Sequence, residues 1–327
     1  MPLHDLLPVE TVSLPTPFGV GVVNTYAIVV DPVTMVDAGV NTVAAENALK
    51  LGFAAKGLFL EAVERILITH GHPDHCGLVP LICNGTDTTR AFMGEKECER
   101  IADTGPAWEY SRRLQEAGFP EDLLKQLTKL ERRTQRVHKV ARLSCNPIRD
   151  GDVFEFKGFE LHAVALPGHT DGHMGFLEPD TRVLFAGDTL LEHDQPNCLL
   201  EPTLEPEGDS PDRRRHSLKQ YLETLDRLQE MELSVVYPGH GPVITNPAET
   251  ICYMRKHHAR RLDVISDCLS PGGTTAFEVS KKLYPGARAY ERFLAVSEVI
   301  AHLDVLVSSG RATSEVHDDG VEYFCRV

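Results

Sequence analysis

With 327 residues, the chain is longer than one typical domain core requires, so we expect a large domain followed by a smaller one. An apolar fraction of 42% and a charged fraction of 25% are typical of a globular protein, and no apolar run is long enough to cross a bilayer. The formal net charge of −15 argues against extended nucleic acids and anionic membranes as partners.

The N-terminal residues and the cysteines both favour a cytoplasmic location. The opening stretch MPLHDLLPVE holds acidic side chains and no basic segment, so it is not typical of a signal peptide. The eight cysteines are scattered singly, with no C-x-x-C pair, which favours reduced thiols over a disulfide framework.

Apolar and β-branched runs predict strands that alternate with helices through the first part of the chain. The predicted strands lie at residues 21–30, 34–39, 64–70, 152–166, 182–188 and 233–241, and the run at 152–166 is a hairpin. A helix is predicted at 44–57, and a strand followed by a helix at 87–101. This order is typical of layered sheets with helices on the outside.

Residues 106–142 interrupt this alternation with two predicted helices, at 106–119 and 120–137. The apolar positions of this insertion form a stripe that we expect to face the sheets. Its members are Trp108, Leu114, Phe119, Leu123, Leu127 and Leu130.

The second helix of the insertion is basic. Arg132, Arg133 and Arg136 share one of its faces at helical spacing, and we expect this face to bind an anionic group of the substrate. The alternative is a face whose charges are merely solvated.

Helices replace strands in the last part of the chain. They are predicted at 248–269, 275–284 and 295–310, and a hairpin at 311–327 turns at Asp318–Gly320. These elements predict a small second module. We expect one domain at residues 1–255, with the insertion at 106–142, and a second at 256–327.

Four of the predicted strands end in loops that carry potential metal ligands. The loops read HGHPDH, PGHTDGH, GDT and PGHG, and they follow Thr69, Leu166, Ala186 and Tyr237. Because strands of one sheet can present their ends along a single edge, ligands distant in the sequence can converge there. Three imidazoles and a carboxylate crowded into HGHPDH are costly without a cation, so this loop indicates a metal most strongly.

Imidazole and carboxylate side chains suit zinc, iron or manganese. Seven of them allow two ions: His70, His72 and His169 for one, Asp74, His75 and His240 for the other, and Asp188 as a bridge. Two close cations would lower the pKa of a shared water and yield a hydroxide at neutral pH. Thr170 and His173 flank His169, and we expect them to be outer partners that fix its ring.

These motifs resemble those of the metallo-β-lactamase superfamily. THGHPDHCG is similar to the H-x-H-x-D-H signature of that superfamily, and PGHTDGH, FAGDT and YPGHG follow in its order and spacing. The resemblance implies an αββα sandwich with the metals at one edge of the paired sheets. It implies the seven ligands named above, with Asp74 close to the nucleophilic water and so a catalytic residue. We expect two divalent ions, with zinc favoured over iron or manganese.

The last part of the chain resembles the lactamase-β-2-like subgroup. YPGHGPVI followed by a long basic helix is similar to that subgroup, and the terminal helices and hairpin resemble its winged-helix module. The expected fold is therefore an αββα metallo-β-lactamase sandwich with a small C-terminal winged-helix domain. True β-lactamases of this fold are secreted and commonly use a cysteine ligand, whereas this chain has Asp188 at that position.

The superfamily cleaves β-lactams, lactones, thioesters and phosphodiesters, so the resemblance alone does not choose a substrate. PGHTDGH and FAGDTL look like the matching segments of glyoxalase II enzymes, and basic runs on an acidic chain favour an anionic substrate. We therefore expect a hydrolase that uses a metal-bridging hydroxide on a small anionic thioester or ester.

Three alternatives stay open: a single-stranded RNA endonuclease, an iron-dependent persulfide dioxygenase and, from another class, a winged-helix regulator that binds nucleic acid. The candidate recognition helix at 295–310 holds no Lys or Arg and only His302 as a cation, so we expect no binding to duplex DNA. We also expect no membrane partner. The module should pack on the sandwich or on a second copy in a homodimer.

Overall fold

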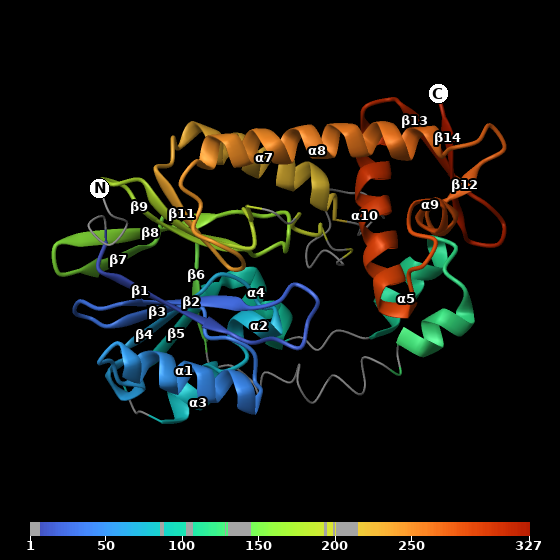
Figure 1. Ribbon diagram of the computed structural model, residues 1–327. Helices are drawn as coiled ribbons and strands as arrows, with labels where there is room; N and C mark the ends of the chain where they lie inside the picture. Colours follow the sequence, from blue (N-terminus) through green and yellow to red (C-terminus); the bar gives the residue numbers. More distant parts are fainter. Residues whose placement is uncertain are drawn as a thin grey trace.

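Two stacked β-sheets form the larger part of the computed structural model, and a helical module lies at one end of them (Figure 1). The structure describes residues 7–85, 88–102, 107–127, 129, 145–192, 195–198, 200 and 215–327. Arg132, Arg133 and Arg136, predicted to bind the substrate, lie outside these residues.

The first sheet has six strands, which follow each other in sequence order. They are β1 (Val9–Leu14), β2 (Val23–Ile28), β3 (Thr34–Val36), β4 (Arg65–Ile68), β5 (Arg90–Gly94) and β6 (Cys145–Ile148). The pairs from β1 to β3 are antiparallel, and those from β3 to β6 are parallel. Strands of a parallel sheet are covered on both faces. Strand β4 is accordingly a continuous apolar run after Arg65.

The second sheet has five strands in the order β11-β10-β9-β8-β7. They are β7 (Val153–Phe156), β8 (Phe159–Ala165), β9 (Met174–Glu178), β10 (Val183–Gly187) and β11 (Val235–Pro238). The predicted hairpin is confirmed as β7 and β8, and Gly158 at its turn has a φ of 103°. Only β10 and β11 run parallel to each other in this sheet, so their C-terminal ends lie at the same edge.

Helices cover the outer face of each sheet (Figure 1). On the first sheet they are α1 (Val43–Ala55) and α3 (Val79–Asn84), with the 3-10 turn η2 (Leu60–Ala62). Helices α2 (Pro73–Cys76) and α4 (Glu95–Ala102) lie at one end of the sheets, after β4 and β5. On the second sheet they are α7 (Ser217–Glu230) and α8 (Pro247–Asp267). Thr42 caps α1 by accepting a hydrogen bond from the backbone N–H of Ala45 at 3.2 Å.

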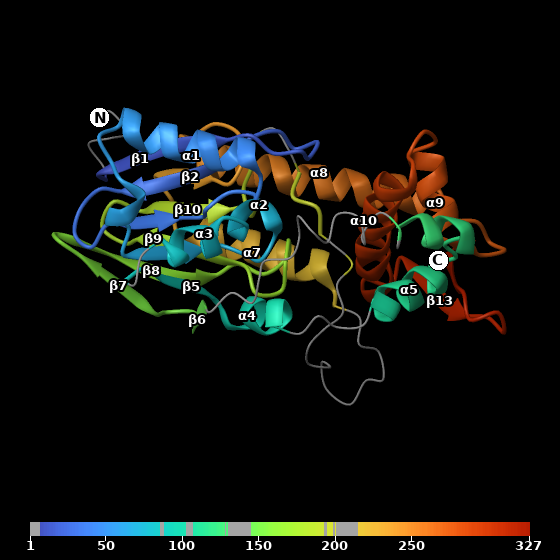
Figure 2. The ribbon, with the colours of Figure 1, turned by 90° about the horizontal axis from the view of Figure 1, so that it is seen from below.

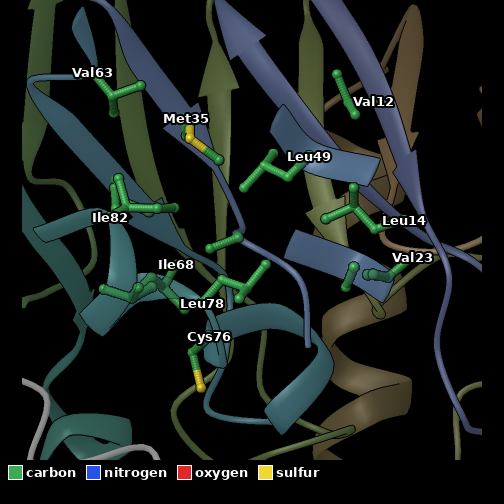
Figure 3. Packing of buried hydrophobic residues seen from close by; sticks show 14 of the residues in the cluster. Val12, Leu14, Val23, Met35, Leu49, Val63, Ile68, Cys76, Leu78 and Ile82 are labelled. Carbon is green, nitrogen blue, oxygen red and sulfur yellow. The ribbon is translucent and has the colours of Figure 1, made fainter. Parts of the chain in front are cut away.

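Three apolar clusters hold these four layers together. Leu49 and Phe53 of α1 pack against the first sheet, in the cluster that Figure 3 shows from close by. A second cluster fills the space between the sheets, and a third lies under α7 and α8. Each fully buried aliphatic or aromatic side chain contributes about 1.5–3 kcal/mol through removal from water. The layered αββα arrangement predicted from the sequence is confirmed.

The C-terminal module contains the predicted helices and hairpin. Its elements are β12 (Thr274–Thr275), α9 (Ala276–Leu283), α10 (Ala289–Ser308), β13 (Ala312–Val316) and β14 (Glu322–Arg326). The three strands form a separate sheet in the order β12-β14-β13. The winged-helix assignment stays a prediction, and the predicted boundary between residues 255 and 256 falls inside α8. No helix among the described residues is long and apolar enough to span a membrane.

The insertion packs differently from the prediction. Leu114, Phe119 and Leu127 are buried in one cluster with Val279 of α9 and Val296 of α10. Helix α5 (Ala107–Glu116) accordingly lies beside α9 and α10 in Figure 2. The expectation that this stripe faces the sheets is wrong, because the C-terminal helices offer an apolar surface that it covers instead. Of the other stripe positions, Leu123 is partly buried in the same cluster, and the side chains of Trp108 and Leu130 lie outside the described ones.

The cysteines also differ in one respect from the expectation. Cys98 of α4 and Cys145 of β6 form a disulfide with a Cα separation of 6.5 Å. Six other cysteines are free. The pair was not visible in the sequence because 47 positions separate its members, and only the packing of α4 on β6 brings them together.

Candidate metal centre

The seven predicted ligands meet at one edge of the paired sheets. They come from the loop and short helix α2 after β4, the loop after β8, and the ends of β10 and β11. In chain order they are His70, His72, Asp74, His75, His169, Asp188 and His240. All but His72 are buried. The convergence predicted from four strand ends is therefore present in the fold.

One group consists of three histidines whose ring nitrogens face one another. His72 Nδ1 lies 2.9 Å from His70 Nε2 and 3.0 Å from His169 Nε2. The rings of His70 and His72 meet edge to face, with their centroids 4.5 Å apart. Three nitrogens this close share one small space, as the ligands of a single metal ion do.

A second group consists of Asp74, His75 and His240. His240 Nε2 lies 3.5 Å from Asp74 Oδ2. Asp188 lies between the two groups: its Oδ1 is 3.4 Å from His75 Nε2, and its Oδ2 is 3.6 Å from both His169 Nε2 and His240 Nε2. One carboxylate thus faces both groups, as a bridging ligand must.

Hydrogen bonds to the outer ring nitrogens determine which nitrogen faces inward. His169 Nδ1 lies 2.9 Å from the backbone oxygen of Asn197, and His240 Nδ1 lies 2.7 Å from that of Val22. A carbonyl oxygen only accepts, so each Nδ1 carries a proton, and the neutral form of each ring keeps an Nε2 lone pair directed inward. That is the tautomer a metal ligand requires.

Asp37 supplies the same kind of support and was missed in the sequence. This buried carboxylate at the end of β3 lies 2.8 Å from His75 Nδ1. It also accepts a hydrogen bond from the Thr69 hydroxyl, which lies 3.0 Å from His70 Nδ1. The sequence could have indicated this residue, because Asp37 in VDAG directly follows an apolar strand, as the predicted ligands do.

Thr170 and His173 were predicted to fix the His169 ring, and that role stays a prediction. The backbone oxygen of Asn197 lies 2.9 Å from His169 Nδ1, and the ring of His173 meets the His169 ring edge to face, with their centroids 6.2 Å apart. The ring of His173 also stacks on that of His70, and His173 Nε2 lies 3.2 Å from the backbone nitrogen of Asp188. Thr170 is buried, and its hydroxyl has no hydrogen-bond partner among the described residues.

The electrostatics of the centre favour a bound cation. Burial lowers the pKa of His70 well below its usual value, and the neighbouring imidazoles lower it further. Burial would also lower the pKa of His75, yet Asp188 and Asp37 raise it well above its usual value. Three buried atoms of the centre have no hydrogen-bond partner in the part of the chain that the structure describes: His75 Nε2, His240 Nε2 and Asp188 Oδ1. Unpaired polar atoms of this kind are costly to bury, and a divalent cation between them would satisfy all three.

A cavity of about 720 Å³ opens onto the centre. Its floor includes His72, Asp74, His169, Asp188 and His240. Its other walls are largely apolar and come from the β1–β2 loop, the loop after β10 and α10. They include Phe18, Val20, Leu191, Tyr290 and Leu294, with the amides of Gln195 and Asn197 beside them. The C-terminal module therefore forms part of the wall of the metal-facing cavity.

Comparison with known proteins agrees with this geometry. A family profile described as the metallo-beta-lactamase superfamily matches residues 18–240, which include all seven candidate ligands. The chain belongs to this superfamily. The probable metallo-hydrolase YqjP of Bacillus subtilis (strain 168) is 30% identical over 310 residues, which are 94% of each protein. Together with the His and Asp groups, this match identifies the chain as a metallo-hydrolase.

Two further relatives bear on fold and substrate. The crystal structure of the metallo-beta-lactamase family protein TTHA1429 from Thermus thermophilus has a TM-score of 0.82 at 31% identity. It aligns with 98% of this chain and over its whole length, so the C-terminal module is part of the shared fold. The atrochrysone carboxyl ACP thioesterase AgnL7 of Paecilomyces divaricatus is 39% identical over 100 residues, which are 31% of this chain and 26% of that protein.

Proposed function

We propose that this metallo-hydrolase cleaves a small anionic thioester or ester, using two divalent metal ions held by the seven ligands. Zinc is the metal we favour, because imidazole and carboxylate donors without a cysteine form its common catalytic sites. One observation carries the proposal: the seven donors converge, and five of them line one wall of a 720 Å³ cavity whose other walls are largely apolar. A carbonyl with an apolar substituent fits between those walls.

Each part of the centre then has a chemical task. Two divalent ions bound there would lower the pKa of a water and polarise the substrate carbonyl. Asp74 faces the cavity beside His240, where its carboxylate can orient the attacking water and carry a proton to the leaving sulfur or oxygen. Asp37, Asn197 and Val22 keep the ligand rings in the required tautomer.

The walls of the cavity support an acyl substrate. Phe18, Leu191 and Leu294 offer apolar surface that an acyl chain can cover. Gln195 adds a buried amide whose nitrogen and oxygen have no hydrogen-bond partner among the described residues. An unpaired amide at a cavity wall suits a polar group of the substrate, such as the amide of a thiol carrier. No Lys or Arg is among the described residues that line this cavity.

The anionic end of the substrate is assigned from the sequence alone. Arg132, Arg133 and Arg136 lie in a basic run of an otherwise acidic chain. Their simultaneous replacement by Ala should raise KM for an anionic thioester, most strongly at low salt, and leave a small neutral ester unaffected. Equal kinetics on both substrates would remove the anionic requirement from the proposal.

A thioester is favoured over the other substrates of the superfamily on the likeness to AgnL7, which is itself named as a thioesterase. The proposal is tested with zinc-loaded protein on coenzyme A and glutathione thioesters, a lactone, a β-lactam, a phosphodiester and single-stranded RNA. We expect the highest kcat/KM on a thioester. A higher kcat/KM on the phosphodiester or on RNA would overturn the thioester assignment. His72→Ala serves as the metal-deficient control.

The remaining partner assignments follow from how the C-terminal module packs. His302, the only cation of the predicted recognition helix, is buried against His258 and its Nδ1 lies 2.7 Å from the backbone oxygen of Glu298. The N-terminal end of α10 faces the cavity through Tyr290 and Leu294. We therefore propose an enzyme that does not bind duplex DNA. The proposals that it is cytoplasmic and binds no membrane rest on the composition and charge of the sequence. Its module completes the substrate site, and the full-length protein, monomer or homodimer, should not retard duplex DNA in a gel.

A further inference from the structure

Helix α4 carries a buried acid that is not among the predicted ligands. Glu97 is 1% exposed, although it lies in the charged stretch EKECER. A carboxylate is almost never buried to this degree unless it is paired and hydrogen-bonded. Its partners therefore indicate why it lies there.

Each oxygen of Glu97 holds a different metal-binding loop. Oε2 accepts a hydrogen bond from the backbone N–H of Gly71 at 2.8 Å, and Gly71 stands between His70 and His72. Oε1 accepts one from the backbone N–H of Gly172 at 3.1 Å, in the loop that begins with His169. One side chain thus joins the two loops that carry all three histidines of the first group.

Neighbouring charges keep this carboxylate ionised. Burial would raise the pKa of Glu97, but Arg100 and the hydrogen bonds to the carboxylate, including that of Gly71, hold it below its usual value. Arg100 pairs with the same oxygen that accepts from Gly71. Lys96, the preceding residue of α4, pairs with Asp171 of the second loop at 3.0 Å. The start of α4 is therefore fixed to the second loop at two points.

The glycines of the two motifs fit this arrangement. A Cβ atom at Gly71 would lie 2.7 Å from Glu97 Oε2, and one at Gly172 would lie 2.7 Å from the Glu97 backbone nitrogen and 2.8 Å from its Cγ. Real Cβ atoms essentially never approach so closely. Positions 71 and 172, in the motifs HGH and DGH, thus require glycine because Glu97 occupies the space beside both loops.

We propose that Glu97 is a positioning residue for the first metal ion: it sets the distance between the loop of His70 and His72 and the loop of His169. The inference rests on the proposed ligand role of those histidines. Among the described residues, Glu97 has no hydrogen bond or ion pair with Asp74, His75 or His240, so its effect should be confined to the first ion.

The experiment first uses variants that each keep only one of the two metal sites intact, and then replaces Glu97 in each of them. In a His240→Ala background only the first site keeps its three histidines, and in a His72→Ala background only the second site keeps its ligands. Cobalt affinity is measured in each background by titration against a chelator, with and without Glu97→Gln. Gln has nearly the same shape but loses the charge and one of the two carboxylate acceptors. Glu99→Gln, at an exposed position of the same helix, is the matched control.

We expect Glu97→Gln to weaken cobalt binding about 10- to 100-fold in the His240→Ala background, in line with other outer partners of metal ligands. Binding in the His72→Ala background, and with Glu99→Gln in either background, should not change. Unchanged affinity in the His240→Ala background, or equal losses in both, would overturn the positioning role. Absence of two metal ions from the wild-type protein would instead contradict the proposed function.

The apo proteins are compared by thermal unfolding, so that a folding defect is recognised. If Glu97→Gln does not fold, Glu97→Asp takes its place, because the shorter side chain cannot reach both loops. The same selective loss is expected for it. Arg100→Gln keeps both acceptors and removes only the ion pair, so it should leave cobalt affinity nearly unchanged. A large loss with Arg100→Gln would assign the effect to the charge pair and not to the two hydrogen bonds.

Discussion

Asp37 and His75 form a buried pair in which a carboxylate oxygen lies 2.8 Å from the ring Nδ1. The other oxygen of Asp37 accepts a hydrogen bond from the backbone N–H of Thr69, also at 2.8 Å. Through the Thr69 hydroxyl, the same carboxylate supports His70. One acid at the end of β3 therefore orients one histidine of each candidate metal group.

Replacement of Asp37 by Asn should weaken metal binding without removing a ligand. Asn has one acceptor oxygen where the carboxylate has two, and its amide nitrogen cannot accept a hydrogen bond from His75 or Thr69, so the rings lose their fixed tautomer. We expect metal affinity to fall about 10- to 100-fold, as for other outer partners of histidine ligands. Metal content after dialysis against a chelator measures this, with Asp31→Asn at an exposed turn as the control. Retention of two ions would show that Asp37 has only a packing role.

Asp74→Asn should separate catalysis from metal binding. The change keeps the shape of the side chain but removes the carboxylate that can move a proton. We expect the protein to keep its fold and much of its metal while kcat falls about a hundredfold or more, which is typical of a lost general acid–base group. Steady-state kinetics on metal-loaded protein measures kcat. Near-normal turnover would leave Asp74 as an ordinary ligand.

Leu294 tests whether the C-terminal module contributes to substrate choice. It lines the cavity from α10, in the same cavity as the candidate metal ligands. Leu294→Gln should raise KM for a thioester with a longer acyl chain and change KM for an acetyl thioester little, because only the longer chain reaches the wall. Val264→Gln, on the exposed side of α8, is the control. An equal change for both substrates would remove the module from the binding site.

The buried pair of His258 and His302 predicts acid sensitivity. Burial lowers the pKa of His258 to about 3 and that of His302 to about 4. The unfolded chain takes up these protons near the ordinary imidazole pKa of about 6.5. Between about pH 6.5 and pH 4 the unfolded state thus binds more protons, so the free energy of unfolding should fall as the pH falls.

The corresponding experiment follows thermal unfolding of the protein with both residues changed to Gln. We expect its melting temperature to depend less on pH between 6.5 and 4 than that of the wild type. His317→Gln, at an exposed turn, should keep the wild-type dependence. An unchanged pH dependence in the double variant would mean that other groups cause the acid sensitivity.

The ligands could be predicted from the sequence because each follows directly on a recognisable structural signal. His70 and Asp188 come at the ends of apolar strands, one in each sheet, and the two sheets present these ends at the same edge. Glu97 could not be predicted in this way. Its charged neighbours in the sequence are typical of a solvent-exposed helix. Glu97 is buried only because the loops of Gly71 and Gly172, which are distant in sequence, pack against α4.

Parts of the fold were missed for similar reasons. The helix α7 was not predicted, although Leu218, Tyr221, Leu225 and Leu228 recur at helical spacing and could have indicated it. Strand β9 is five residues long and follows directly on a ligand loop, so its pattern is too short to stand out. The stripe of the insertion was recognised, but a stripe does not specify which of two apolar surfaces it will cover.

Anomalous X-ray scattering at the zinc edge, from crystals of zinc-loaded protein, tests the metal centre most directly. We predict two peaks in each chain, one among His70, His72 and His169 and one among Asp74, His75 and His240. Asp188 should contact both ions, since its oxygens face both groups. A single peak, or peaks away from these seven residues, would contradict the two-metal hydrolase.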